Sequence, residues 1–384
     1  MRRITDQVYA ADHPIKNLRV NYLLTGSISA IVRGDILLSS FRDENHNLDY
    51  GKTEADEYWS RFRLTIPRAS RRGPVPVVMY GHGLGILKES DLTVALFNAM
   101  NGVATVSIDQ PNHGSRIAQD GGYGIIKLGV NNVPLQVGMT AQSPIDFIAL
   151  LKAVQTSMTG IDVVPRKFFS PLAGPVVEGK NGDGIPDLDT TRIFYQGTSL
   201  GGVLGATFIA LAPDLKGAFL QVPGVGITSI LSGSNLWDLA YHQLEPPSVD
   251  GAEALLLKAV MQHQMDYGDA INFVHFIHNP LPGRTDKKLA MVVAQDDGVV
   301  PNFSAIALAE LTDTPIIGKQ IFDMPGVRVN DSTEFENGNG IVQVPPILNV
   351  GVSVLDQTFA HTSFLHPRGL AALIRWTREE IPSH

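Results

Sequence analysis

Residues 194–205 read FYQGTSLGGVLG, and this stretch decides the fold. Ser199 stands between Gly197 and Gly201 in the spacing G-x-S-x-G, with an apolar strand predicted over 192–196 and an apolar helix over 202–212. A strand that turns sharply into a helix strains the backbone at the tip and leaves no room for side chains two positions away. The stretch therefore predicts a nucleophile elbow with Ser199 at its tip. A glycine- and serine-rich turn between two core elements is the alternative.

The composition narrows the classes of function. The chain has 384 residues, of which 44% are hydrophobic and 18% charged, and its formal net charge is −8. A negative balance argues against a nucleic-acid partner. There is no cysteine, which excludes disulfides, thiolate metal sites and a cysteine nucleophile. No apolar run approaches the ~20 residues needed to span a bilayer, so no integral membrane segment is expected.

The first residues, MRRITDQVYAADHP, show no apolar segment after the basic residues, so no signal peptide is visible. The compartment stays open. We expect a secreted or periplasmic location if the chain starts after a removed signal, and a cytoplasmic location otherwise. The oligomeric state is not defined by the sequence.

The order of predicted elements indicates an α/β fold with a mostly parallel central sheet and helices on both faces. From residue 71 on, strands alternate with helices. We expect strands over 75–80, 103–108, 193–196, 216–222, 289–294 and 346–355, and helices over 91–101 and 143–156.

Two other regions flank or interrupt this alternation. Residues 1–70 predict a β-rich extension packed on the core, with hairpin strands over 20–24, 28–32 and 35–39 and a turn at Arg33-Gly34. Residues 223–286 predict an inserted helical cap, with a helix over 252–265. The catalytic unit is then 71–222 together with 287–384.

In an open parallel sheet, chemistry lies beyond the carboxyl ends of the strands. Gly81-His82-Gly83-Leu84-Gly85 follows the first of them and offers backbone N–H groups that can hold an oxyanion. Asp296 and Asp297 follow strand 289–294, and His361 follows the last strand. A serine needs a base, and the base needs a carboxylate that orients it. The order serine, acid, histidine is that of the α/β hydrolases.

The segments GHGLG, GTSLGG, DDGVVPN and AHTSF resemble those of α/β-hydrolase esterases and lipases, over about residues 60–380. The chain also resembles bacterial lipases that carry an NGDGIPDLD-like segment before the elbow. The resemblance implies Ser199 as nucleophile, His361 as general base and Asp297 as the acid. It implies an oxyanion hole formed by the backbone N–H groups of Leu84 and Leu200.

Several positions have competing interpretations. Asp296 is the alternative acid, and Asp356 is a weaker one. His366 precedes Pro367 and is expected to cap the last helix, with a role as the base as the alternative. His113 either lines the site or hydrogen-bonds its own loop. The residues proposed for the substrate pocket are His82, His113, Leu236 and Trp237.

Residues 181–189 read NGDGIPDLD and resemble half of an EF-hand-like loop. Asn181, Asp183 and Asp187 are the candidate ligands of a structural calcium ion, but position 12 of such a loop is Thr190, where an acid is expected. An Asx-rich turn is the alternative. No cofactor is required by the predicted chemistry.

The sequence thus predicts a carboxyl-ester hydrolase that forms an acyl-enzyme from a small-molecule or lipid-like ester. An amidase, peptidase or acyltransferase of the same fold is the alternative, followed by a non-catalytic binding protein.

Overall fold

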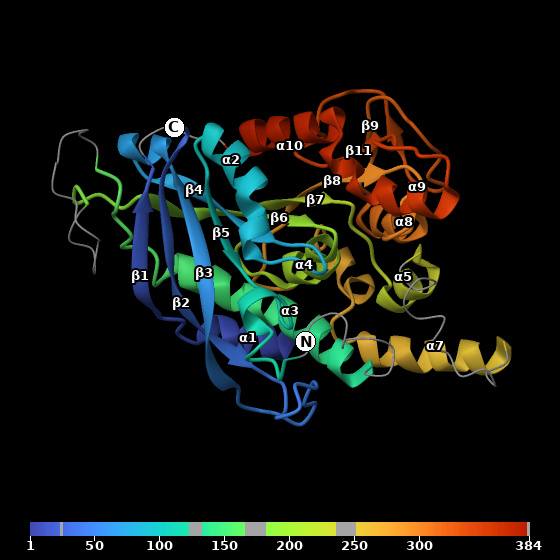
Figure 1. The fold of residues 1–384 in the computed structure, drawn as a ribbon, viewed down its shortest axis with the longest axis horizontal. Helices are drawn as coiled ribbons and strands as arrows, with labels where there is room; N and C mark the ends of the chain where they lie inside the picture. Colours follow the sequence, from blue (N-terminus) through green and yellow to red (C-terminus); the bar gives the residue numbers. More distant parts are fainter. Residues whose placement is uncertain (24–25, 123–132, 166–181, 236–250, 382–384) are drawn as a thin grey trace.

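The structure is a computed structural model that describes residues 1–23, 26–122, 133–165, 182–235 and 251–381. Within these ranges, eleven strands form one sheet in the order β1-β2-β3-β5-β4-β6-β7-β8-β11-β9-β10 (Figure 1). The strands are β1 (Ile15–Tyr22), β2 (Ile28–Ser40), β3 (Asp56–Pro67), β4 (Val75–Gly81), β5 (Ala104–Ile108), β6 (Leu188–Thr198), β7 (Gly217–Gln221), β8 (Lys288–Ala294), β9 (Ile316–Ile317), β10 (Val329–Asn330) and β11 (Gly340–Val344).

The sheet is parallel from β5 onward and antiparallel at its N-terminal end, where β1, β2 and β3 pair in sequence and β3 pairs with β5. The helices are α1 (Arg2–Ala10), α2 (Leu92–Met100), α3 (Val133–Gln155), α4 (Leu200–Leu211), α5 (Ile227–Gly233), α7 (Gly251–Met265), α8 (Asn302–Thr312), α9 (Ser353–Ala360) and α10 (Pro367–Glu380). No described helix combines the length and the apolar character that a bilayer crossing needs.

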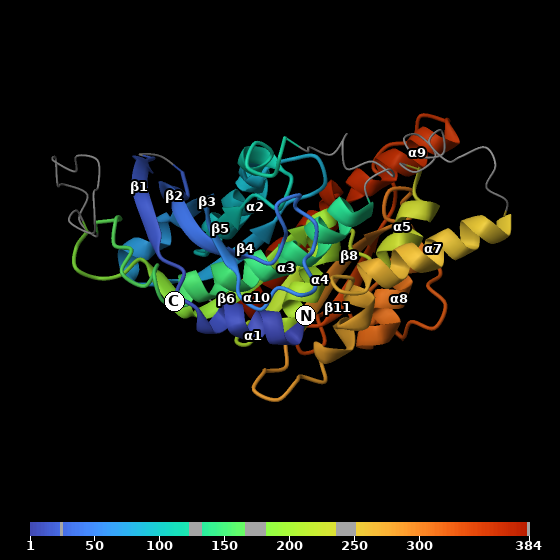
Figure 2. The same ribbon diagram turned by 90° about the horizontal axis from the view of Figure 1, so that it is seen from below.

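The helices cover the sheet from two sides. Side chains of α1, α3, α4 and α8 form one buried apolar cluster with the sheet, and α1 packs against α3 (Figure 2). Side chains of α2 and α10 form a second cluster that includes Trp376. A parallel sheet buried on both faces explains why β4 and β8 are almost continuous apolar runs. This is the α/β-hydrolase fold that the sequence predicts.

The N-terminal strands continue the central sheet edge to edge, because β3 is hydrogen-bonded to β5 along Phe62–Thr65. The predicted turn at Arg33-Gly34 is wrong, since β2 runs unbroken through both residues. A Cβ on Gly34 would lie 2.7 Å from the Leu18 side chain and 2.9 Å from the Lys16 carbonyl oxygen. Gly34 therefore permits a close approach of β1, whose register shifts between Lys16 and Arg19. The helix α1 was not expected in this region.

Two later expectations also need correction. The last long strand is β11, and 346–355 is not a strand. Pro345 and Pro346 have no N–H to donate to a ladder, and Gly351 has φ +77. The apolar alternation at 347–354 instead leads into α9. The helix predicted over 143–156 begins ten residues earlier, at Val133, with Pro144 inside it.

Candidate active site

Ser199 lies at the tip of the turn between β6 and α4, with φ 56 and ψ −119. Such angles are strained for any residue with a side chain. A Cβ on Gly197 would lie 2.3 Å from the Gly201 carbonyl oxygen, and a Cβ on Gly201 would lie 2.0 Å from the Gly81 carbonyl oxygen. The two glycines of the motif are therefore required by backbone contact. The predicted strand, sharp turn and helix are present.

The hydroxyl of Tyr195 supports this turn from inside the core, which sequence reasoning missed. Tyr195 is fully buried, and its hydroxyl donates a hydrogen bond to the Gly201 carbonyl at 2.7 Å. A Cβ on Gly81 or on Gly205 would lie 2.0 or 2.4 Å from the same hydroxyl. Gly81 of β4 and Gly205 of α4 thus make room for one phenol that holds the first turn of α4.

His361, at the end of α9, brings Ser199 and Asp297 together. Its Nε2 lies 2.8 Å from the Ser199 Oγ, and its Nδ1 lies 2.8 Å from Asp297 Oδ2 and 3.0 Å from Oδ1. With Nδ1–H donating to the carboxylate, Nε2 is free to accept the serine proton. The Asp297 side chain is 3% exposed and the His361 side chain 12%, so the serine side of the chain of hydrogen bonds remains accessible.

The loop after β8 positions Asp297 and turns Asp296 away. Asp297 Oδ1 also accepts hydrogen bonds from the backbone N–H groups of Val299 and Val300, each at 2.9 Å. Asp296 is exposed and has φ 57. The carboxylate of Asp356 accepts from the Val350 N–H at the start of α9.

The other histidine near the C-terminus has a different partner. His366 Nδ1 accepts a hydrogen bond from the Arg368 N–H at 3.1 Å and so caps α10. The sequence-based expectation of a helix cap at His366 is confirmed.

The turn at 81–85 faces Ser199. A Cβ on Gly83 would lie 3.4 Å from the Ser199 Cβ, so the turn passes directly beside the serine. Leu84 is 39% exposed, and its N–H has no hydrogen-bond acceptor among the described residues. Leu200 begins α4, where the first N–H groups of a helix lack intrahelical partners. These two N–H groups remain the predicted oxyanion hole.

His82 supports this turn from behind. It is completely buried, its Nδ1–H donates to the Gly83 carbonyl at 2.9 Å, and its Nε2 accepts from the Gln110 N–H at 3.0 Å. The Gln110 side chain donates to the His82 carbonyl at 2.6 Å and accepts from the Ser143 hydroxyl of α3. Burial, followed by the nearby His113, lowers the pKa of His82 to about 4. A neutral, enclosed imidazole fits a role in holding the turn.

His113 hydrogen-bonds its own loop, as one of its two interpretations predicted. Its Nδ1–H donates to the Pro111 carbonyl at 2.7 Å, and its ring lies 5.1 Å from that of His82. Its Nε2 is buried and has no partner within the described ranges. Burial lowers the pKa of His113, so this ring is also held neutral.

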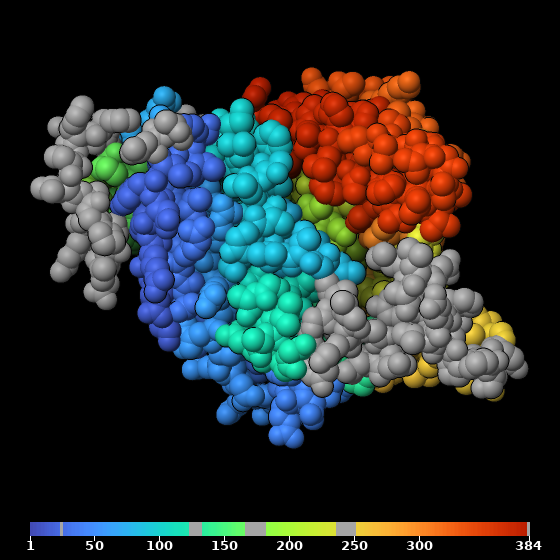
Figure 3. Space-filling view, in the orientation of Figure 1, coloured from blue at the N-terminus to red at the C-terminus, as the bar shows by residue number. Residues whose placement is uncertain are grey.

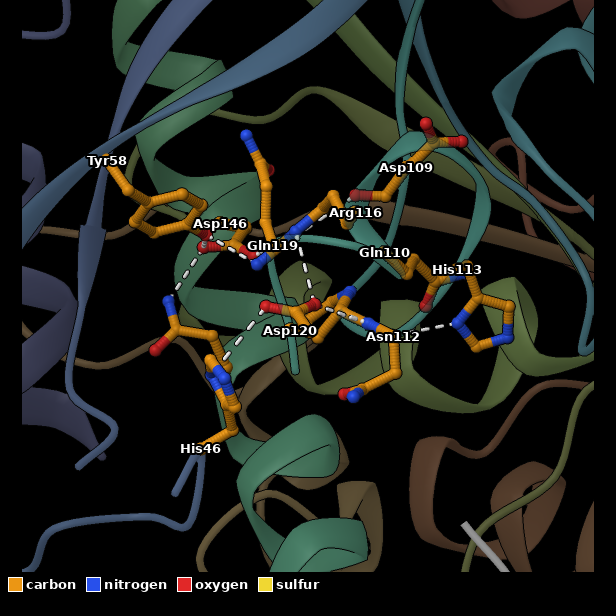
Figure 4. A network of polar contacts seen from close by, with 12 residues as sticks. His46, Tyr58, Asp109, Gln110, Asn112, His113, Arg116, Gln119, Asp120 and Asp146 are labelled. Atoms are coloured by element: carbon orange, nitrogen blue, oxygen red, sulfur yellow. Dashed lines mark hydrogen bonds and ion pairs between the residues drawn. The ribbon is translucent and has the colours of Figure 1, made fainter. Parts of the chain in front are cut away.

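A buried ionic network anchors the loop that follows β5 (Figure 4). Arg116, fully buried, contacts Asp146 of α3 at 2.5 Å and the Tyr58 hydroxyl at 2.7 Å. Asp120 accepts from Arg42 and from the Asn112 N–H, both at 2.6 Å. Two arginines thus face two carboxylates, so the buried charge is compensated. The loop carrying Gln110 and His113 is consequently fixed relative to β3 and α3.

Some predicted site residues fall outside the described ranges. Leu236, Trp237 and Asn181 are among them, so the proposed apolar pocket and one calcium ligand stay predictions. The described part of the 223–286 segment includes α5 and α7. Buried Asp269 joins these helices by accepting from the Gly226 and Ile227 N–H groups and from the Gln262 amide.

The acidic loop before β6 has partners of its own. The Asp183 and Gly184 N–H groups donate to the Asp162 carboxylate, and Asp187 accepts from the Val163 and Val164 N–H groups. Within the described residues, no group of three histidine, cysteine, aspartate or glutamate side chains could hold a metal ion.

No family model matches the chain, and no curated protein matches its sequence. Among solved structures, it is similar to acetyl xylan esterase 1 from Thermoanaerobacterium sp. JW/SL YS485, with 14% identity and a TM-score of 0.48 over 94% of this chain and 91% of that one. It is also similar to an acetyl xylan esterase from Paenibacillus sp. R4, with 12% identity and a TM-score of 0.47 over 90% and 85%. Because these sequence identities and TM-scores are low, the function is argued from the geometry of the site.

Proposed function

We propose that the chain is a serine carboxyl-ester hydrolase. The observation that carries the proposal is the continuous hydrogen-bond path from Ser199 Oγ through the His361 ring to Asp297, with 2.8 Å at each end. A hydroxyl at an elbow, a neutral imidazole acceptor and a buried orienting carboxylate are the parts that activate a serine. In the space-filling view, part of the yellow-green segment is visible between the cyan and the red segments (Figure 3).

The mechanism follows from the positions of these groups. Ser199 Oγ attacks the ester carbonyl while His361 Nε2 takes its proton, and the Leu84 and Leu200 N–H groups stabilise the oxyanion. The intermediate collapses with loss of the alcohol, which receives the proton from His361. A water molecule, deprotonated by His361, then attacks the acyl-enzyme. The acyl–Oγ bond breaks, His361 returns the proton to Ser199 Oγ, and the carboxylic acid leaves. Asp297 fixes the imidazole tautomer throughout.

Substrate class follows from the surroundings of the turn. Leu84, Ile86 and Leu87 are 39–44% exposed, and a Cβ on Gly83 would touch both the Ile86 side chain and Ser199. An apolar surface beside the nucleophile favours an ester with an apolar acyl or alcohol part.

The proposal is tested with an organophosphate and a series of p-nitrophenyl esters of rising chain length. We expect one covalent adduct per chain, located at Ser199 by peptide mass spectrometry. Ser199→Ala should fold with an unchanged melting temperature and lose on the order of 10⁴-fold or more in kcat. Hydrolysis that survives Ser199→Ala, or an adduct on another residue, would overturn the proposal.

A further inference from the structure

A second pocket lies between α10 and the strands β9 and β11, outside the residues of the candidate active site. It has a volume of about 300 Å³. Its apolar walls come from Ile317 of β9, Val342 of β11 and the neighbouring Ala371 and Ala372 of α10. Figure 1 shows α10 beside these strands. The two alanines keep this space open, because longer side chains at the same positions of α10 would fill it.

Three cationic side chains line the same pocket. They are Lys319 after β9, and Arg368 and Arg375, which lie seven residues and so two turns apart on one face of α10. None of the three makes an ion pair with a carboxylate within the described residues. The nearby Glu336 is already paired with Arg328 at 2.8 Å. The pocket therefore concentrates positive charge that the described chain does not neutralise.

Both guanidinium groups are held in place by the fold. Arg368 Nη2 donates to the Lys319 carbonyl at 2.6 Å, and burial lowers the pKa of Arg368. The Arg375 guanidinium lies 4.6 Å from the centre of the Phe335 ring, over its face. Arg375 Nε is buried and has no hydrogen-bond partner within the described ranges. A buried donor without an acceptor is costly, so the position of this guanidinium is maintained by its packing against Phe335.

We propose that this pocket binds a small organic anion, a carboxylate on a short apolar body, through Arg368 and Arg375. The planar guanidinium fork matches a carboxylate, and the aliphatic walls match a short hydrocarbon chain. An inorganic anion would leave the apolar walls without a partner. The proposal does not depend on the chemistry at Ser199.

The test is calorimetric titration of the full chain with hexanoate at constant ionic strength, after treatment with an organophosphate to block Ser199. The comparison ligands are hexanol, which has the tail without the charge, and inorganic phosphate, which has the charge without the tail. We expect hexanoate to bind at least tenfold more tightly than either. Arg368→Gln and Arg375→Gln should each weaken hexanoate binding about tenfold or more.

Arg378→Gln is the matched control, because it removes the same charge from the same helix but lies outside this pocket, where its Nε contacts Asn101. Its affinity for hexanoate should stay within twofold of the unchanged chain. Ala371→Leu fills the exposed side of the hollow and should abolish binding even if an arginine variant fails to fold. Phosphate binding as tight as hexanoate, an equal loss in Arg378→Gln, or no binding of hexanoate would each overturn the proposal. If Ser199 does not react with the organophosphate, the differences among the arginine variants still decide it.

Discussion

The backbone of one loop decides which carboxylate His361 meets. At Asp297 the side chain turns inward, where it accepts from the Val299 and Val300 N–H groups as well as from the imidazole. At Asp296 the left-handed conformation directs an exposed side chain elsewhere. The backbone angles of these two adjacent aspartates therefore decide which of them meets His361. The spacing of residues in the sequence does not give these angles.

From this difference we predict that substitutions of the two aspartates have different effects on activity. Asp297→Asn should keep the two backbone hydrogen bonds through its amide oxygen, but its N–H₂ would favour the wrong imidazole tautomer. We expect a loss of about 10⁴-fold in kcat with little change in melting temperature. Asp296→Asn, the matched control, should stay within a fewfold of the unchanged enzyme, because asparagine tolerates a positive φ. Equal losses in the two variants would contradict the assignment of Asp297.

The sequence identified the site residues that act through local chemistry and missed those that act through contact. Ser199, with its flanking glycines, is a local backbone requirement, and the structure places His361 and Asp297 where the chain order suggested. The supports, Tyr195 and Gln110, touch the site only after strands distant in sequence come together. A tyrosine two residues before a G-x-S-x-G glycine, with further glycines at 81 and 205, was a readable signal, but its meaning depends on the packing.

At the scale of elements, the sequence indicated which segments form the sheet more reliably than where they bend. Arg33-Gly34 reads as a turn, yet Gly34 serves a close strand contact inside β2. The alternation at 347–354 reads as a strand, yet its side chains are largely exposed and no neighbouring strand pairs with it in the described sheet. In the first case, pairing of β2 with β1 and β3 overrides the local turn pattern. In the second, the local strand pattern has no pairing partner within the described sheet.

Asp187 lies between the 161–164 segment and β6, and it predicts how the stability of the protein depends on pH. Burial raises the pKa of Asp187 from 3.8 to about 7, while its carboxyl accepts from the Val163 and Val164 N–H groups. Between these two values the folded chain holds a proton that the unfolded chain has released. The contribution of Asp187 to stability is therefore fully present below about pH 4 and lost as pH rises through 7.

Asp187→Asn should consequently stabilise the protein at pH 8 and have little effect at pH 4, because an amide oxygen accepts the same hydrogen bonds without a charge. Melting temperatures measured across this range, without and with added calcium, provide the check. A bound calcium ion would reverse the result at pH 8, since it needs the ionised carboxylate. If the variant is less stable than the unchanged chain at pH 8 in calcium, and more stable than it without calcium, the result favours the calcium interpretation of the 181–189 loop.

On the scale of the whole molecule, the sheet extends without interruption from β1 to β10, and its N-terminal edge is β1. This strand carries charged residues and an irregular register at Lys16–Arg19, features that discourage pairing with another chain. The next strand, β2, is thirteen residues long and alternates buried apolar side chains such as Ile36 and Leu38. Removing β1 would leave this long strand as an open edge.

A chain lacking residues 1–23 should therefore self-associate, whereas a chain lacking only residues 1–10 should not. The shorter deletion removes α1, with the buried Ile4 and Val8, and should lower the melting temperature because each such side chain contributes about 1.5–3 kcal/mol when buried. It leaves β1 in place, so its oligomeric state should match that of the full chain.

The longer deletion exposes the N–H and C=O groups of β2 and should form concentration-dependent aggregates, measured by size-exclusion chromatography with light scattering. Dilute samples of it should still form the organophosphate adduct, because the turn at Ser199 is built by β4, β6 and α4, several strands away from the new edge. Equal behaviour of the two deletions would show that β1 adds stability without protecting the edge of the sheet.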